Sequence, residues 1–252
     1  MKGQFHDVIR VPEGADTAVL LLHGILSAPQ FFAFLLPAVP QNYAVYGILL
    51  SGHGGDAAGL THTTLNRWEL QVSLLMKQLS AKYRRIFIAA HSMGTLFALR
   101  LAKQYPQNIS GMLLLGVPLC THLTPFGAVC SVLLALGYQP HTARGKAMQQ
   151  AYSLTPDARL WRYLGWLPRY AELFDEIFRT RPLLSGLRVP CAAFQSARDE
   201  LVSLRTLPML AAVPAVKLRV LRTASHFYYP PQEKSRILRV WYRMLRYSGT
   251  AI

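Results

Sequence analysis

The sequence predicts an α/β protein whose core is a doubly wound, mostly parallel sheet, with a small helical cap inserted into it. Short apolar runs rich in Val and Leu alternate with stretches of helical spacing, and these runs have the continuous hydrophobicity of strands buried on both faces. One aromatic-rich stretch breaks the alternation. A chain of 252 residues can bury one sizeable core. We therefore expect a core formed by residues 1–117 and 188–252 and a cap formed by residues 118–187.

The first elements of the chain read as strand, helix, strand. The apolar runs Ala18–Leu22 and Tyr43–Leu50 are expected as strands. Between them, Ala28–Leu36 is an apolar helix candidate that Pro37 and Pro40 would close.

An amphipathic helix comes next, and the alternation then continues. One face of this helix carries Trp68, Val72, Leu75, Met76 and Leu79. The later elements are expected as strands over Ile86–Ala90, Gly111–Leu115, Pro190–Gln195 and Val216–Leu221, with a helix over Thr95–Lys103 and a last one over Pro231–Tyr247.

The stretch from Pro118 to Leu187 holds mostly helical candidates, and we interpret it as the cap. Its aromatic residues are Trp161, Tyr163, Trp166, Tyr170, Phe174 and Phe178. They have two interpretations, either attaching the insertion to the core or together lining a pocket for an acyl chain.

The chain is strongly basic, with 27 Lys and Arg against 12 Asp and Glu and a net charge of +15. In the last helix, Arg236, Arg239, Arg243 and Arg246 fall opposite an apolar face. A solvated surface is the favoured interpretation of the basic face, and weak contact with an anionic membrane is the alternative. We expect no nucleic-acid partner, and the sequence does not indicate an oligomeric state.

The composition favours a cytoplasmic protein. The first twenty residues lack a basic segment followed by a long apolar run, so we expect no cleaved signal peptide. The longest apolar stretch, Phe126–Leu136, is shorter than the roughly 20 residues that cross a bilayer. Cys120, Cys130 and Cys191 have no metal-ligand spacing and are expected as buried thiols.

A turn between strand and helix presents Ser92 as the candidate nucleophile. A serine hydroxyl is a poor nucleophile near neutral pH, so it needs a nearby base and a turn that exposes it above the sheet. The segment Ala90-His91-Ser92-Met93-Gly94 resembles a G-x-S-x-G turn, with Ala90 in place of the first glycine. A chance serine in such a turn is the alternative.

Asp199 and His226 follow Ser92 in the order that such a nucleophile requires. Asp199 follows one late strand and His226 follows the last strand, so both belong to the sheet edge where Ser92 is expected. His226 would move the proton and Asp199 would orient it. Glu200 is a rival carboxylate, and the joint placement favours Asp199.

Backbone amides are expected to stabilise the oxyanion. The N–H groups of Ile25 and Met93 are the candidate donors, because Met93 follows the nucleophile and Ile25 follows the His23-Gly24 turn. Gly24 would let this backbone approach the substrate.

The other histidines have no assigned chemistry. His91 is expected to be structural, and His53, in a loop near the site, to pack or form hydrogen bonds. His62, His122 and His141 are far apart in sequence or lack ligand spacing, so we expect no metal site.

With these residues in place, the chain resembles the α/β-hydrolase superfamily, particularly small carboxylesterases and monoacylglycerol lipases, over nearly its whole length. The matching segments, in order, are Leu21-Leu22-His23-Gly24, Gly52-His53-Gly54, the turn at Ser92, Arg198-Asp199-Glu200-Leu201-Val202 and Ser225-His226. The resemblance implies the triad Ser92, Asp199 and His226, no cofactor, and a helical cap over an apolar acyl pocket.

The leading hypothesis is therefore a carboxylic-ester hydrolase that forms an acyl-enzyme on Ser92. Its substrate would be a small ester with an apolar acyl group, such as a short or medium-chain ester or a monoacylglycerol. The same triad would also suit an amide or peptide hydrolase or an acyltransferase. A non-catalytic basic binding protein is the least favoured hypothesis.

Overall fold

The computed structural model describes residues 5–157 and 159–246 and contains a seven-stranded sheet in the order β1-β3-β2-β4-β5-β6-β7. All neighbouring strands of this sheet are parallel except the pair β1 and β3. The strands are β1 (Val8–Arg10), β2 (Thr17–Leu22), β3 (Ala44–Gly47), β4 (Arg85–His91), β5 (Ile109–Leu115), β6 (Cys191–Ser196) and β7 (Val216–Leu221). The predicted α/β fold with a mostly parallel sheet is confirmed.

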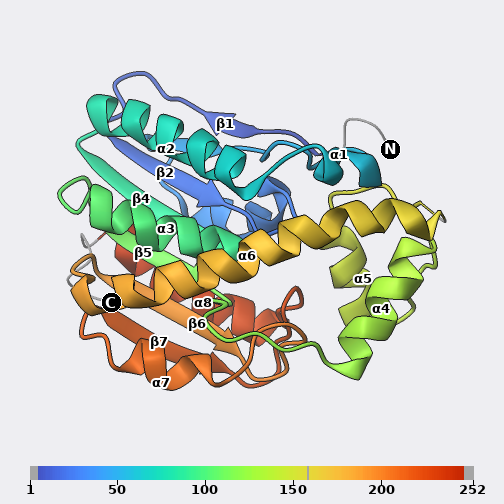
Figure 1. The fold of residues 1–252 in the computed structure, drawn as a ribbon. Helices are drawn as coiled ribbons and strands as arrows, with labels where there is room; N and C mark the ends of the chain where they lie inside the picture. The colour runs from blue at the N-terminus through green and yellow to red at the C-terminus, as the bar shows by residue number, and fades with distance from the viewer. Residues whose placement is uncertain (1–4, 158, 247–252) are drawn as a thin grey trace.

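Helices cover both faces of this sheet (Figure 1). The α-helices are α1 (Ala57–Thr61), α2 (Leu65–Lys82), α3 (Met93–Gln104), α4 (Pro125–Ala135), α5 (Ala143–Ala151), α6 (Leu167–Thr180), α7 (Thr206–Ala211) and α8 (Pro231–Arg246). Three further segments are 3-10 helices, η1 (Pro29–Ala38), η2 (Leu160–Trp166) and η3 (Arg181–Gly186).

The two faces of the sheet bury separate hydrophobic clusters, because side chains alternate along each strand. In β2, Leu20 belongs to the same cluster as Trp68 of α2, whereas its neighbour Leu21 belongs to the cluster of Phe32 in η1 and Trp241 in α8. All five side chains are completely buried. The run of consecutive apolar residues in β2 thus reflects burial on both faces.

Two elements differ from the predicted ones for identifiable reasons. The segment Pro29–Ala38 is a 3-10 helix rather than an α-helix and contains Pro37, which lacks an N–H group and restricts the residue before it. The predicted strand Tyr43–Leu50 is shorter, because β3 ends at Gly47. Beyond it, Leu49 N–H donates to the Asp7 carboxylate and Leu50 N–H donates to His23 instead of to a strand.

Three short elements were not predicted, namely β1, α1 and α7. They have between three and six residues, which is too few to produce a distinct period in the sequence.

The residues between β5 and β6 are mostly helical and divide into two parts (Figure 1). Helices α4 and α5 lie beyond the carboxyl ends of the strands, whereas α6 packs along α3. Leu173 and Ile177 of α6 and Leu184 of η3 belong to the same hydrophobic cluster as Leu20 and Trp68. The boundaries 118–187 stay a prediction, and this packing joins α6 to the core layer.

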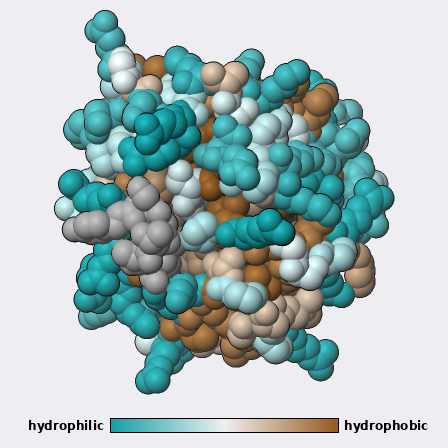
Figure 2. Space-filling view, turned by 90° about the vertical axis from the view of Figure 1, so that its left-hand side faces the viewer, coloured by the Kyte–Doolittle hydropathy of each residue, from teal (hydrophilic) through white to brown (hydrophobic). Residues whose placement is uncertain are grey.

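Helix α8 confirms the predicted last helix as far as Arg246, and Tyr247 lies outside the described residues. Its Arg236, Arg239 and Arg243 line a hollow of about 210 Å³ together with Arg219 of the edge strand β7. Figure 2 shows that hydrophilic side chains cover much of the face opposite α4 and α5, around a smaller apolar area. Within residues 5–157 and 159–246, every helix is too short or too polar to cross a membrane.

The expectation of three buried thiols is correct for Cys191 and wrong for the other two. Cys191 lies in β6, where burial raises the pKa of its thiol. Cys120 and Cys130 are half-buried, because they lie in the segment that leaves the sheet after β5 and in α4.

A buried carboxylate connects α6 to α3. The Glu176 side chain is 1% exposed, and its Oε1 lies 2.5 Å from Arg100 Nη2. Arg100 Nε also lies 3.0 Å from Glu69 Oε1 on α2, so one guanidinium joins three helices. A buried carboxylate is tolerated when a cation and hydrogen bonds compensate for its lost hydration.

We predict that Arg100→Ala destabilises the protein by about 3 kcal/mol, because it leaves Glu176 buried without its cation. Urea unfolding at neutral pH measures this change. The control is Arg179→Ala. It removes the exposed ion pair between Arg179 and Asp175 (2.7 Å), both on α6, and should cost less than about 1 kcal/mol. Equal losses in the two variants would contradict the prediction.

Candidate active site

Ser92 lies on a tight turn between β4 and α3, with φ 52° and ψ −126°. Such a backbone conformation costs about 1–3 kcal/mol for a residue other than glycine. Three hydrogen bonds hold the turn. Ser92 N–H donates to Leu115 O (2.9 Å), and both the N–H (2.9 Å) and the Oγ1 hydroxyl (2.6 Å) of Thr95 donate to Ser92 O. Ala90, which replaces the first glycine of the motif, is completely buried in β4, so its methyl group is accommodated.

Two glycines allow neighbouring backbone to approach this turn closely. A Cβ on Gly24 would lie 2.8 Å from Ser92 Cβ, and a Cβ on Gly94 would collide with the carbonyl oxygen of Leu22. The loop after β2 therefore lies directly against the Ser92 side chain. Only a residue without a side chain fits at either position unless the backbone shifts.

Asp199 and His226 meet at the same edge of the sheet. The His226 Nδ1 atom lies 3.0 Å from Asp199 Oδ1 and 2.9 Å from Asp199 Oδ2, and both side chains are buried. Asp199 Oδ1 also accepts hydrogen bonds from the N–H groups of Leu201 (2.9 Å) and Val202 (2.8 Å). Because a carboxylate accepts hydrogen bonds, Nδ1 of His226 is the donor, and Nε2 is the ring nitrogen that does not contact Asp199.

The backbone of His226 is held from both sides. Its N–H group donates to Glu200 Oε2 at 2.9 Å, and its carbonyl oxygen lies 3.0 Å from His91 Nε2, which donates to it. The His91 ring stacks on Phe31 with 4.1 Å between ring centroids. Glu200, the rival carboxylate, thus contacts the His226 backbone, while Asp199 contacts the ring.

The two predicted oxyanion donors lie beside Ser92. Met93 is the first residue of α3, where a backbone N–H has no partner within the helix. Ile25 follows Gly24 and lines the same cavity as Ser92. Both amides therefore belong to the segments that converge on the serine.

Two buried histidines brace the loop that carries Ile25, and the sequence did not indicate the first of them. The His23 ring accepts from Leu50 N–H (3.0 Å) and donates through Nδ1 to Gly24 O (2.8 Å). His53 accepts from the N–H of Leu26 (3.2 Å) and donates to Leu50 O (3.2 Å), as its predicted hydrogen-bonding role requires. Leu26 has φ 61°, so this contact holds a strained residue.

Both rings need their neutral form for these contacts, since each accepts a hydrogen bond at Nε2. Burial lowers the pKa of His53 to about 4 and lowers the pKa of His23 well below its usual value, with a smaller contribution from the neighbouring His53. Burial also lowers the pKa of His91, with a smaller contribution from the neighbouring His226. All three rings are neutral at pH 7.

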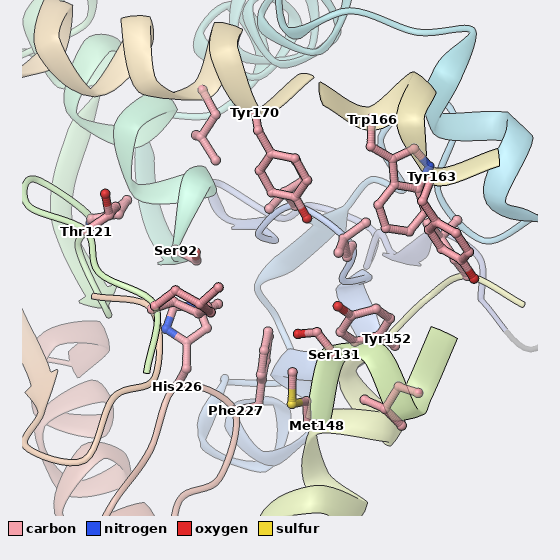
Figure 3. Close-up of a pocket in the computed structure, with 18 of the residues that line it drawn as sticks. Ser92, Thr121, Ser131, Met148, Tyr152, Tyr163, Trp166, Tyr170, His226 and Phe227 are labelled. Carbon is pink, nitrogen blue, oxygen red and sulfur yellow. The ribbon is translucent and has the colours of Figure 1, made fainter. Parts of the chain in front are cut away.

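Ser92 and His226 open into a cavity of about 740 Å³ that residues of α4, α5 and α6 also line (Figure 3). Of the aromatic residues predicted in the cap, Tyr163, Trp166, Tyr170 and Phe174 line this cavity. Trp161 and Phe178 are 67% and 62% exposed, so they serve neither predicted role. Among the described residues that line the cavity, no Lys, Arg, Asp or Glu occurs.

A protein-family model for the alpha/beta hydrolase fold matches residues 17–177. The chain belongs to the α/β-hydrolase family. Within the described residues, no group of three His, Cys, Asp or Glu side chains has the arrangement of a metal site.

Solved α/β-hydrolase structures superpose on nearly the whole chain. A structure of the metagenome-derived lipolytic enzymes LipS and LipT has a TM-score of 0.75 at 22% identity and covers 97% of this chain and 98% of its own. The monoacylglycerol lipase of Paleococcus ferrophilus has a TM-score of 0.67 at 16% identity, with 96% and 98% covered. At such low sequence identities, the superpositions show a shared fold and nothing more.

One curated relative matches part of the α/β-hydrolase chain. It is the pimeloyl-[acyl-carrier protein] methyl ester esterase of Aromatoleum aromaticum (strain DSM 19018 / LMG 30748 / EbN1), 31% identical over 110 residues. The match covers 44% of this chain and 41% of that relative, so the chain spans less than half of the length of the relative.

We predict that the buried histidines make this protein sensitive to acid. The unfolded chain protonates histidine near pH 6.5, whereas folded His53 stays neutral until about pH 4, so the unfolded state binds more protons between these values. Stability should therefore fall as pH is lowered from 6.5 to 4, with His53 contributing on the order of 3 kcal/mol.

Urea unfolding at several pH values, compared with a His53→Gln variant, measures this contribution. The variant cannot titrate at position 53 and should show a shallower decline between pH 6.5 and 4. Identical slopes in the two proteins would show that His53 does not contribute.

Proposed function

We propose that the protein is a serine hydrolase of carboxylic esters, with Ser92 as nucleophile, His226 as base and Asp199 as the carboxylate that orients His226. The observation that carries this proposal is the hydrogen bond between Asp199 and Nδ1 of His226, a ring that lines the same cavity as Ser92 and has its other nitrogen, Nε2, turned away from Asp199. Serine, imidazole and carboxylate in this arrangement are suited to acyl transfer.

In the proposed reaction, Ser92 Oγ attacks the ester carbonyl carbon while His226 Nε2 takes the hydroxyl proton. The carbonyl oxygen becomes an oxyanion that accepts hydrogen bonds from the N–H groups of Ile25 and Met93, each donor contributing about 3 kcal/mol in related sites. His226 then protonates the departing alkoxide, which leaves an acyl group on Ser92. A water molecule, deprotonated by His226, then attacks the acyl carbon. The bond between this carbon and Ser92 Oγ breaks, His226 returns the proton to Oγ, and the acid is released.

The cavity lining favours a substrate whose acyl group is uncharged. Its lining is largely apolar and includes Met148, Leu154 and Trp166. The hydroxyl groups of Ser131, Tyr152 and Tyr170 face the cavity (Figure 3) and offer hydrogen bonds to uncharged oxygen atoms. A charged group inside it would lose hydration without gaining an opposite charge, which is costly.

Ester hydrolysis is preferred to amide hydrolysis and acyl transfer, although all three would use the same side chains. The similar proteins include a monoacylglycerol lipase and a methyl ester esterase, both named for ester bonds. A comparison of an ester and an amide with the same acyl group tests this preference directly.

We predict that Ser92→Ala abolishes covalent labelling by a fluorophosphonate and lowers kcat for p-nitrophenyl esters by roughly four orders of magnitude or more. Esters of graded chain length also measure the acyl group that the cavity accepts. Ser235→Ala, on the surface helix α8, is the control and should leave both unchanged. If the unsubstituted protein is neither labelled nor active, the binding-protein hypothesis replaces this proposal.

We also predict that a carboxylate at the far end of the acyl chain is poorly tolerated. A p-nitrophenyl monoester of a dicarboxylic acid should have a kcat/KM at least about tenfold below that of the uncharged ester of equal chain length, since no Lys or Arg occurs among the described residues of the lining. Steady-state kinetics at pH 7 measures the ratio. Equal values for both esters would show that the acyl chain does not enter the cavity.

A further inference from the structure

Glu200 is a buried carboxylate that the proposed reaction does not use. It follows Asp199 in sequence and is 5% exposed. Its two oxygens have different partners, since Oε2 accepts from the backbone N–H of His226 at 2.9 Å and Oε1 lies 2.5 Å from Arg144 Nη2. One side chain therefore connects the backbone of the proposed base to a cation from a distant part of the chain.

Arg144 belongs to α5, one of the two helices that lie beyond the sheet. Besides Glu200, it donates through Nη2 to the carbonyl oxygen of Arg198 at 3.1 Å. Its guanidinium carbon lies 4.6 Å from the centre of the Phe126 ring on α4. Arg144 thus contacts the loop that carries Asp199 and also packs against the neighbouring helix.

The segment that leads into α4 is attached to the same loop through its backbone. The N–H of His122 donates to Leu201 O (2.9 Å), and the N–H of Thr124 donates to Glu200 O (3.0 Å). His122 Nε2 also lies 3.0 Å from Asp199 O. These contacts attach the N-terminal end of α4 to the loop that carries Asp199, and the Arg144–Glu200 contact attaches α5 to the same loop.

We propose that Glu200 and Arg144 form a positioning pair, through which the placement of α5 sets the position of His226. This inference rests on the proposed function, because it concerns the base of that reaction. A carboxylate bound to a cation is a strong acceptor with a fixed direction, so Glu200 holds the His226 N–H firmly while Arg144 stays in place. When Arg144 is absent, Glu200 loses its compensating charge and its orientation.

The pair acts on the reaction through His226 and not through the acyl pocket, because neither Glu200 nor Arg144 lines the cavity. A displaced imidazole weakens proton transfer from Ser92, and small displacements in an active site can lower the rate by about two orders of magnitude. Binding of the ester depends on the cavity lining, which the pair does not form. Loss of the pair should therefore lower kcat and leave KM nearly unchanged.

The test compares Arg144→Ala, Glu200→Gln and Arg144→Lys with the unsubstituted protein on a p-nitrophenyl ester. We expect kcat to fall about ten- to hundredfold in the first two variants with KM changed less than about twofold, and Lys to restore part of the loss. The rate of fluorophosphonate labelling should fall with kcat, since it reports the reactivity of Ser92. Thermal unfolding checks that each variant is folded.

Arg159→Ala is the matched control. Arg159 also forms an ion pair in the inserted segment, with Asp157 at 2.8 Å, but makes no contact with the Asp199 loop or with His226. An equal loss of kcat in Arg159→Ala, or a change confined to KM in Arg144→Ala, would overturn the positioning pair. An unchanged Arg144→Ala would overturn it as well.

The outcomes separate this inference from the proposed function. If the unsubstituted protein is labelled and active while the Arg144 and Glu200 variants match it, the positioning pair is wrong and the ester hydrolase stands. If the unsubstituted protein is neither labelled nor active, both are wrong.

Discussion

The pairing of β2 with β4 is the constraint on which the candidate site depends. Their register places Leu22 opposite Ala90, so the loops that leave the two strands emerge side by side. Gly24 and Gly94 allow the backbone to approach without a clash, and the Ser92 turn forms in the space that remains. The strain of that turn is supported by the surrounding sheet, which buries Ala90 completely.

The electrostatics around this turn combine neutral rings with compensated carboxylates. His23 and His53 are kept neutral by burial, which allows them to accept hydrogen bonds from the backbone at Leu50 and Leu26. The charge in the site is concentrated in adjacent carboxylates, Asp199 and Glu200, whose partners are an imidazole and a guanidinium. Hydrogen bonds to neutral histidine rings therefore hold the loops, whereas the two carboxylates contact the ring and the backbone N–H of His226.

The segment between β5 and β6 contributes to the molecule in two ways. Helix α6 completes a layer of the core, where Glu176 and Arg100 join it to α3. Helices α4 and α5 enclose the cavity, and Arg144 connects them to the loop of the proposed acid. The same segment thus contributes to stability, to the apolar lining of the cavity and to a link with the proposed catalytic residues.

The sequence by itself determined the alternation of strands and helices, the turn at Ser92 and the order of Asp199 and His226, because each is a local pattern of hydrophobic spacing or turn residues. It also favoured Asp199 over Glu200 as the carboxylate that orients His226, but only from their positions in the chain. The tertiary structure decided what each carboxylate contacts and revealed the brace formed by His23. Those contacts join residues 26 or 27 positions apart, or 56 in the case of Arg144 and Glu200. Directions of side chains across such separations depend on how the loops pack, which local patterns do not encode.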